Sequence, residues 1–179
     1  MAWRSRNVLA FNSYNRNTSG VTAKTRRAGH ADDRAGELFE SLEQRTLLFA
    51  WTPQEVYLAE LVNRARANPA AEGTRLGIDL TAGLSGPELA RLVAQQPLAL
   101  NQALTLASRA HSADMAARNF FDHVNPSGKN PTQRAQAAGY TGSVGENIAA
   151  GYSSIDDVHK AWLQSVGHRK NCLLYTSDA

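Results

Sequence analysis

Two histidines and one glutamate stand out among the residues whose side chains can do chemistry: His123, Glu146 and His168. Each lies beside a glycine or a turn signal, so each is expected where a helix or strand gives way to a loop. Neutral imidazoles and a carboxylate suit a zinc-type ion, which often keeps one position open. The same groups could transfer protons, because histidine titrates near neutral pH. Spacing alone leaves their convergence on one site a hypothesis.

Some neighbouring residues allow a structural role beside a functional one. Ser165, His168 and Glu146 have the residue types of a hydrolytic triad, but no G-x-S-x-G turn surrounds the serine, which argues against that role. Asn147 is expected to shape its turn with its side-chain amide, with ligand contact as the alternative. His111 is expected to be a helix residue bonded to a neighbour, with a place near the site as the alternative.

The elements that must position these residues begin with a helix at Pro53. Thr52 is a suitable N-cap and Glu55 completes a capping box. The helix is expected to stop or kink at Asn68-Pro69. Residues 73–86, with four glycines, are expected to form a loop, and a short helix follows over residues 87–96. The residues expected on the buried face of the first helix are Leu58, Leu61, Val62 and Ala65.

A longer helix is expected over residues 102–120, capped by Asn101. A short helix from Pro131 to Ala138, a strand at 145–150 and a helix capped by Ser154 follow. In that last helix Ile155, Val158 and Trp162 are interpreted as core, whereas Arg169 further on is interpreted as solvated. The apolar face expected for the long helix consists of Ala103, Leu106, Ala110, Ala113, Ala117 and Phe120.

Composition limits the classes of function. The chain has 179 residues, 42% hydrophobic and 20% charged, which is typical of one soluble domain plus a tail. No apolar run is long enough to span a membrane. Residues 1–50 hold eight Lys/Arg against five Asp/Glu, while residues 51–179 hold eleven of each, so the net charge of +3 belongs to the tail. A neutral folded part argues against nucleic-acid binding.

Five sequence segments occur in an order that resembles bacterial members of the CAP superfamily of cysteine-rich secretory, antigen and pathogenesis-related proteins. They are YLAELVNRARANPAA, FFDHVNPSG, PTQRAQAAGY, GENIAAG and AWLQSVGHRKN. The resemblance runs from about residue 53 to residue 171. It implies a secreted protein of the α+β class, with a three-layer α–β–α sandwich and a large cleft, mostly helical in the part present and incomplete at the C-terminus.

The resemblance also implies which residues line the cleft. The family has two histidines and two acidic residues there, and His123, Glu146 and His168 match three of these positions. The fourth position holds Ser165, so only a three-ligand site for Zn²⁺ is implied. Ser165 and Asn147 complete the set of expected cleft residues. An extracellular or cell-surface location follows from the same resemblance.

The two ends of the chain carry separate expectations. Residues 1–50 are interpreted as a disordered tail, and residues 39–50, FESLEQRTLLFA, resemble the LEPR-XLL motif of large secreted bacterial proteins, a sorting or processing signal. The CAP domain is expected over residues 51–171. Residues 172–179, CLLYTSDA, match the translation of a common sequencing adapter, so an assembly artefact is expected there. Missing strands would make the chain poorly soluble or partly unfolded.

Three kinds of function are compatible with these observations. The first is a secreted binding module whose cleft takes a metal ion, a lipid, a peptide or a glycan without turnover. The second is an extracellular hydrolase that uses a metal-bound water or a histidine base. The third is a structural or adhesive module of a larger surface protein. The sequence names neither the ligand nor the oligomeric state, because specificity depends on the shape of the cleft.

Overall fold

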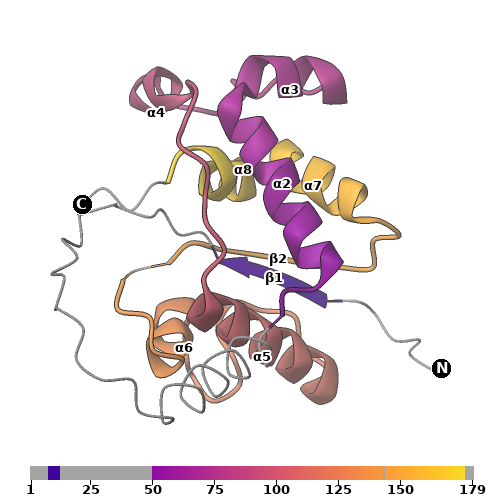
Figure 1. Cartoon of the computed structure of the whole chain (residues 1–179), viewed down its shortest axis with the longest axis vertical. Coiled ribbons are helices and arrows are strands. Elements are labelled where there is room, and N and C mark those ends of the chain that lie inside the picture. The colour runs from indigo at the N-terminus through magenta and orange to yellow at the C-terminus, as the bar shows by residue number, and fades with distance from the viewer. Residues whose placement is uncertain (1–7, 13–49, 143, 176–179) are drawn as a thin grey trace, which may run out of the picture. The chain divides into compact units, whose positions relative to one another are not determined.

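The computed structural model describes residues 50–142 and 144–175 in full and residues 8–12 as backbone only. All of its helices and strands belong to one compact unit. Most of the LEPR-XLL-like segment, residues 39–49, lies outside the described residues. The elements in chain order (Figure 1) are β1 (Val8–Asn12), α2 (Pro53–Ala67), α3 (Pro69–Leu76), α4 (Gly86–Arg91), α5 (Gln102–Arg118), α6 (Pro131–Ala137), β2 (Glu146–Ala150), α7 (Ile155–Gln164) and α8 (Val166–Leu173).

Helix α2 follows its sequence signals closely. It begins at Pro53, and its last residue is Ala67, one position before the Asn68-Pro69 stop. A proline at the first helical position costs no hydrogen bond, and the residue before a proline avoids helical geometry, which explains both boundaries. The predicted inner face is confirmed, since its four members are buried: Leu58, Leu61, Val62 and Ala65.

Helix α3 extends into residues 73–76, which were expected to begin a loop. Asn68 ends one helix and caps the next, because its side chain accepts a hydrogen bond from the amide of Ala71 at 3.0 Å. The helix ends at Gly77, whose φ of 66° is left-handed. Gly73 is required by close packing, since a Cβ there would lie 2.9 Å from the carbonyl oxygen of Ile78.

Helix α5 has the predicted cap but a different buried face. Asn101 accepts from the amide of Leu104 at 3.1 Å, as a capping residue should. The predicted face is wrong, because Leu106 is exposed. The small side chain of alanine gains little from burial, so an alanine-rich helix gives a weak pattern, and the polar residues Ser108 and His111 on the true face conceal it. That face consists of Leu104, Ala107, Ser108, His111 and Met115.

The two strands pair antiparallel, with Val8 opposite Ala150 and Asn12 opposite Glu146. β2 confirms the strand expected near residues 145–150. β1 lies within the stretch interpreted as a disordered tail, so that interpretation does not hold for residues 8–12. The carbonyl oxygens of Glu146 and Ile148 accept from side chains, Asn171 Nδ2 at 3.1 Å and Trp162 Nε1 at 3.4 Å.

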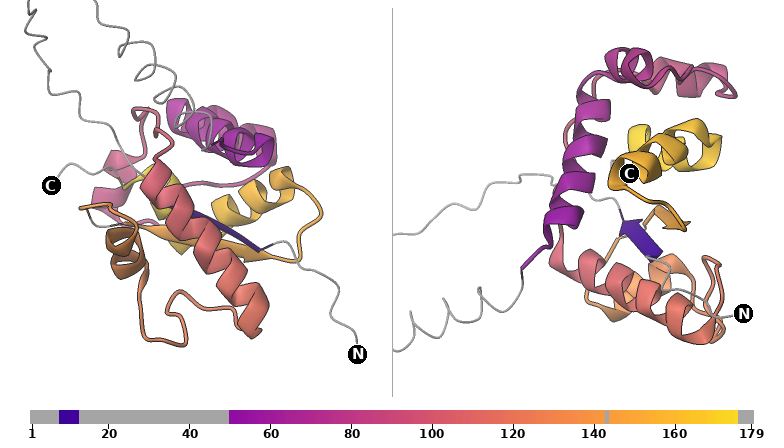
Figure 2. Two further views of the ribbon diagram at one scale, coloured as in Figure 1. Left: turned by 60° about the horizontal axis from the view of Figure 1, so that its bottom comes forward. Right: turned by 90° about the vertical axis from the view of Figure 1, so that its right-hand side faces the viewer.

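Helices lie on both sides of the strand pair (Figure 2). Helix α5 contacts β1, α8 contacts β2, and α2 packs on α7 and α8. The described part of the chain is therefore mostly helical with little strand. A two-stranded pair is too small to establish the expected three-layer sandwich, which stays a prediction.

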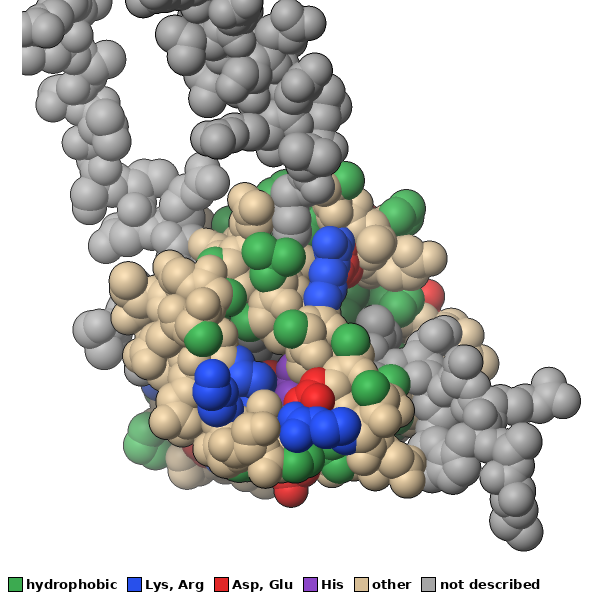
Figure 3. All heavy atoms as spheres, turned by 90° about the horizontal axis from the view of Figure 1, so that it is seen from below, with side chains coloured by type: hydrophobic (Ala, Val, Ile, Leu, Met, Phe, Trp, Pro, Cys, Tyr) green, Lys and Arg blue, Asp and Glu red, His purple; other side chains and the backbone are tan. Residues whose placement is uncertain are grey.

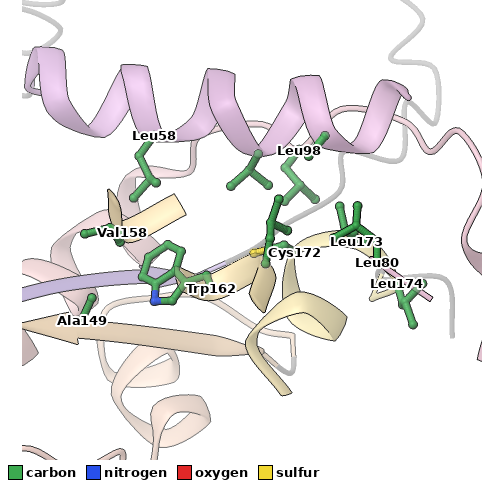
Figure 4. Close-up of a cluster of buried hydrophobic side chains, with 12 residues drawn as sticks. Leu58, Leu80, Leu98, Ala149, Val158, Trp162, Cys172, Leu173 and Leu174 are labelled. Atoms are coloured by element: carbon green, nitrogen blue, oxygen red, sulfur yellow. The ribbon is translucent and has the colours of Figure 1, made fainter. Parts of the chain in front are cut away.

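The core lies between α2 and the pair α7–α8. Trp162 sits at its centre, below α2 and next to the strands, with Leu58 and Val158 (Figure 4). Helix α7 has the predicted cap, since Ser154 Oγ accepts from the amide of Asp157 at 3.1 Å. Helix α8 was not expected. It buries Cys172, and Leu173 and Leu174 beside it are also buried, while the adapter origin of residues 172–179 stays an expectation.

Candidate functional site

A buried carboxylate organises the candidate site. Glu146 is the first residue of β2, and its side chain is 2% exposed. Its Oε1 accepts a hydrogen bond from His123 Nδ1 at 2.9 Å. Its Oε2 accepts from Arg134 Nη2 at 2.7 Å. Because both oxygens are engaged, the carboxylate is compensated in its buried position.

His123 is the exposed member of this group. It lies in the loop after α5, and 46% of its side chain is exposed. An ionised carboxylate only accepts hydrogen bonds, so Nδ1 carries the proton in the pair with Glu146. The other ring nitrogen, Nε2, is then an acceptor in the neutral ring. The pair resembles the carboxylate–histidine arrangement that orients imidazoles toward a ligand.

A further imidazole, that of His111, is buried next to the carboxylate of Glu146. Its Nε2 is 3.0 Å from the carbonyl oxygen of Asp122 and 3.8 Å from Glu146 Oε1. The carbonyl can only accept, so Nε2 is the protonated nitrogen. Burial lowers the pKa of His111, and the negative charge of Glu146 only partly opposes this, so the ring is neutral at neutral pH. The sequence interpretation placed His111 near the site only as an alternative.

Arg134 is the residue that sequence reasoning missed. It lies on α6, its side chain is 9% exposed, and beside Glu146 it donates to two carbonyl oxygens, those of His123 at 2.6 Å and Lys129 at 2.8 Å. One guanidinium therefore ties the 123–129 loop to β2. The segment PTQRAQAAGY was noticed for its resemblance, but nothing in it shows that its arginine faces a carboxylate twelve positions later.

His168 lies on α8, within electrostatic range of His123. Its Nδ1 is 2.9 Å from Ser165 Oγ, three residues earlier. Burial lowers the pKa of His168, and the nearby charge of His123 lowers it further, so the two imidazoles lie within electrostatic range of each other. The hydrogen bond between His168 Nδ1 and Ser165 Oγ orients the ring of His168.

Two asparagines connect β2 with α8. Asn147 Nδ2 donates to the carbonyl oxygen of His168 at 3.1 Å and to Cys172 Sγ at 3.2 Å. Asn171 donates to Asn147 Oδ1 at 2.8 Å. Burial raises the pKa of the Cys172 thiol to about 12, so this sulfur is unreactive. The asparagines thus hold the Glu146 and His168 segments together.

The structure provides less for a metal ion than the sequence interpretation assumed. Within residues 50–142 and 144–175 no group of three or more His, Cys, Asp or Glu side chains is placed to hold an ion. Both oxygens of Glu146 are already used. In His123 and His168 a neighbouring side chain engages Nδ1, so Nε2 is the ring nitrogen left for a ligand, with Glu146 supporting the ring of His123.

The surface around the site is mixed in character. Viewed from below, histidine atoms are visible between basic and acidic groups, set back from the surrounding surface (Figure 3). Phe121 and Val124, on either side of His123 in sequence, are 55% and 47% exposed. Arg169, interpreted as solvated, is 2% exposed instead and donates to the carbonyl oxygens of Leu163 and Ala82.

Comparison with known proteins identifies the family. The profile of the cysteine-rich secretory protein family, CAP, matches residues 59–178, two thirds of the chain, and the chain belongs to that family. A curated relative is the uncharacterized protein YkwD of Bacillus subtilis (strain 168), 40% identical over 79 residues. The match covers 44% of this chain and only 31% of the relative. No solved structure matches the chain significantly.

Proposed function

We propose that this chain is a secreted binding module, in which His123 and His168 contact the ligand and Glu146 and Arg134 position His123. The observation that carries the proposal is the contact between a buried carboxylate and a half-exposed imidazole, His123 Nδ1 to Glu146 Oε1 at 2.9 Å. Burying a carboxylate costs desolvation free energy unless the carboxylate is paired. A solvent-exposed hydroxyl or carboxylate could orient a surface histidine without this cost. The contact between Glu146 and His123 is explained if His123 Nε2 has to be held in a fixed orientation for a ligand.

The proposed ligand is a lipid, a peptide or a glycan. The exposed apolar side chains next to His123 suit a ligand that is partly apolar, while the imidazoles suit a polar group on it. We also propose that the domain has the three-layer sandwich of the family, with this site in its cleft. None of the helices in the described part of the chain combines the length and apolar character that crossing a membrane requires.

A divalent metal is a further proposal for the same site. His123 and His168 would hold it, with Glu146 supporting the first ring. A zinc-type ion supplies an electrophilic contact for a ligand oxygen. Two protein donors bind more weakly than three or four, so an affinity in the micromolar range or weaker is expected.

The test is an NMR titration of the histidine ring signals of the full chain. The probes are dodecylphosphocholine micelles, tetra-alanine, cellotetraose and ZnCl₂, each added separately. At least one organic probe should shift the His123 and His168 signals saturably, and His123→Ala should abolish that binding. His30→Ala, a histidine outside the described residues, is the matched control. If no organic probe shifts either ring, the binding module is refuted; if zinc alone fails, only the metal is lost.

A hydrolase is the second candidate, favoured by one observation. Ser165 Oγ lies 2.9 Å from His168 Nδ1, within the distance for proton transfer. The serine is close in sequence to the histidine and starts α8, which also explains the contact structurally. Turnover of p-nitrophenyl acetate or a casein digest by the wild type, lost in Ser165→Ala, would favour this candidate over the binding module.

A further inference from the structure

A second charged cluster lies on α2, α3 and α7, which carry none of the residues of the histidine site. Its centre is Glu72 on α3, whose side chain is 2% exposed. Arg64 donates through Nε and Nη2 to its two oxygens, both at 3.0 Å. Arg75 does the same at 3.0 and 2.6 Å. His159 Nε2 on α7 completes the set at 2.9 Å.

The cluster holds more positive than negative charge at its centre. Burial alone would raise the pKa of Glu72, but hydrogen bonds from Arg75, Arg64 and His159 outweigh it and hold the pKa well below its ordinary value. Burial lowers the pKa of His159, so this ring is neutral at neutral pH. One buried carboxylate therefore contacts two guanidinium groups, and the charge of Asp156 on α7 offsets part of the remaining positive charge.

Both guanidinium groups remain available to a ligand. The side chains of Arg64 and Arg75 are 46% and 44% exposed. Each uses one edge, Nε and Nη2, on Glu72, and neither Nη1 group hydrogen-bonds to the described part of the chain. Because a buried carboxylate fixes both planes, little side-chain entropy is left to lose on binding.

We propose that Arg64 and Arg75, fixed on Glu72, form a binding site for a tetrahedral oxyanion, a sulfate or phosphate group. Paired guanidinium groups match such an ion with several charge-assisted hydrogen bonds. The site shares no residue with the proposed histidine site.

A neighbouring acidic residue limits the affinity. Asp156 on α7 accepts from Tyr57 Oη at 3.1 and 3.2 Å, and its charge is close enough to raise the pKa of Arg75, after the larger effect of Glu72. Its carboxylate repels an incoming anion. Removing the charge of Asp156 should therefore strengthen binding without disturbing the bonds to Glu72.

The experiment follows the Nε–H signals of Arg64 and Arg75 by NMR while sodium sulfate or phosphate is added at constant ionic strength. Saturable shifts of both signals are expected, with acetate binding at least about fivefold more weakly because it has fewer acceptor oxygens. Arg64→Gln and Arg75→Gln should each weaken binding about tenfold or more. Arg118→Gln is the matched control, because that arginine is similarly exposed, at 39%, but shares its carboxylate partner Asp114 with no second arginine among the described residues. His123→Ala should leave the oxyanion affinity unchanged.

Several outcomes would overturn the proposal. Shifts that never saturate, or acetate binding as tightly as sulfate, would do so. If an arginine variant does not fold, Asp156→Asn decides, since it should bind about threefold more tightly and an unchanged affinity contradicts the site. A heparin tetrasaccharide and glycerol 3-phosphate then identify the source of the oxyanion. Tighter binding of the heparin fragment supports a sulfated partner, and tighter binding of glycerol 3-phosphate supports a phosphorylated one. If neither probe binds, both kinds of partner are refuted.

Discussion

At the scale of single residues, the proposed histidine site depends on side chains that lie far apart in the sequence. His123, Glu146 and His168 could be chosen because histidine and glutamate have recognisable chemistry. His111 and Arg134 could not, because their importance comes from what they face in space. His111 is buried against Glu146, and no local pattern predicts that contact. The role of an ionisable residue depends on its partners, and these are set by the fold.

The mutual influence of the two histidines gives a prediction. Burial and the charge of His123 both lower the pKa of His168. In His123→Ala the second cause disappears, so the pKa of His168 should rise toward its ordinary value. A pH titration of its ring signal by NMR measures this, with His30→Ala as the control. An unchanged pKa would mean that the two rings do not sense each other.

At the scale of elements, boundaries set by capping residues were predictable and packing was not. The starts of α2, α6 and α7 follow from proline, asparagine and serine signals beside them. Helix α8 was not predicted because it is only eight residues long and contains Gly167, and glycine has a low helix propensity. The buried face of α5 was wrong because alanines carry little information on burial.

The cap of α6 can be tested directly. Asn130 Oδ1 accepts from the amide of Gln133 at 2.9 Å, and Gln133 Oε1 accepts from the amide of Asn130 at 3.0 Å. Asn130→Ala removes half of this reciprocal pair and should lower the free energy of unfolding by about 1 kcal/mol. Urea denaturation followed by circular dichroism measures the change. The exposed Gln136→Ala on the same helix should have little effect; equal losses would contradict the capping role.

At the scale of the whole molecule, two charged centres are built from different helices. The histidine site draws on α5, α6, β2 and α8, whereas the Glu72 cluster draws on α2, α3 and α7. Both use a buried carboxylate that is compensated by arginine and histidine. The second centre could not be predicted from the sequence, because its residues look like ordinary surface charges on helices.

This arrangement makes stability depend on pH. The pKa values of His111, His159 and His168 are all lowered, in each case chiefly by burial. The unfolded chain therefore takes up protons near the ordinary histidine pKa of about 6.5, where the folded chain does not. The free energy of unfolding should fall as the pH is lowered from about 7.5 to about 5.5.

Thermal or urea unfolding at several pH values checks this. His168→Gln removes one of the three groups and should make the dependence shallower. Stability that stays constant or increases on acidification would contradict the buried, neutral state of these rings.

The side chains of Trp162 and Asn171 have a consequence for how copies of this chain meet. They occupy two carbonyl oxygens of β2, those of Ile148 and Glu146. A strand from another molecule would have to displace an indole and an amide before it could use those acceptors. The same contacts that fasten the helices to the strand therefore occupy two acceptors that an added strand would compete for.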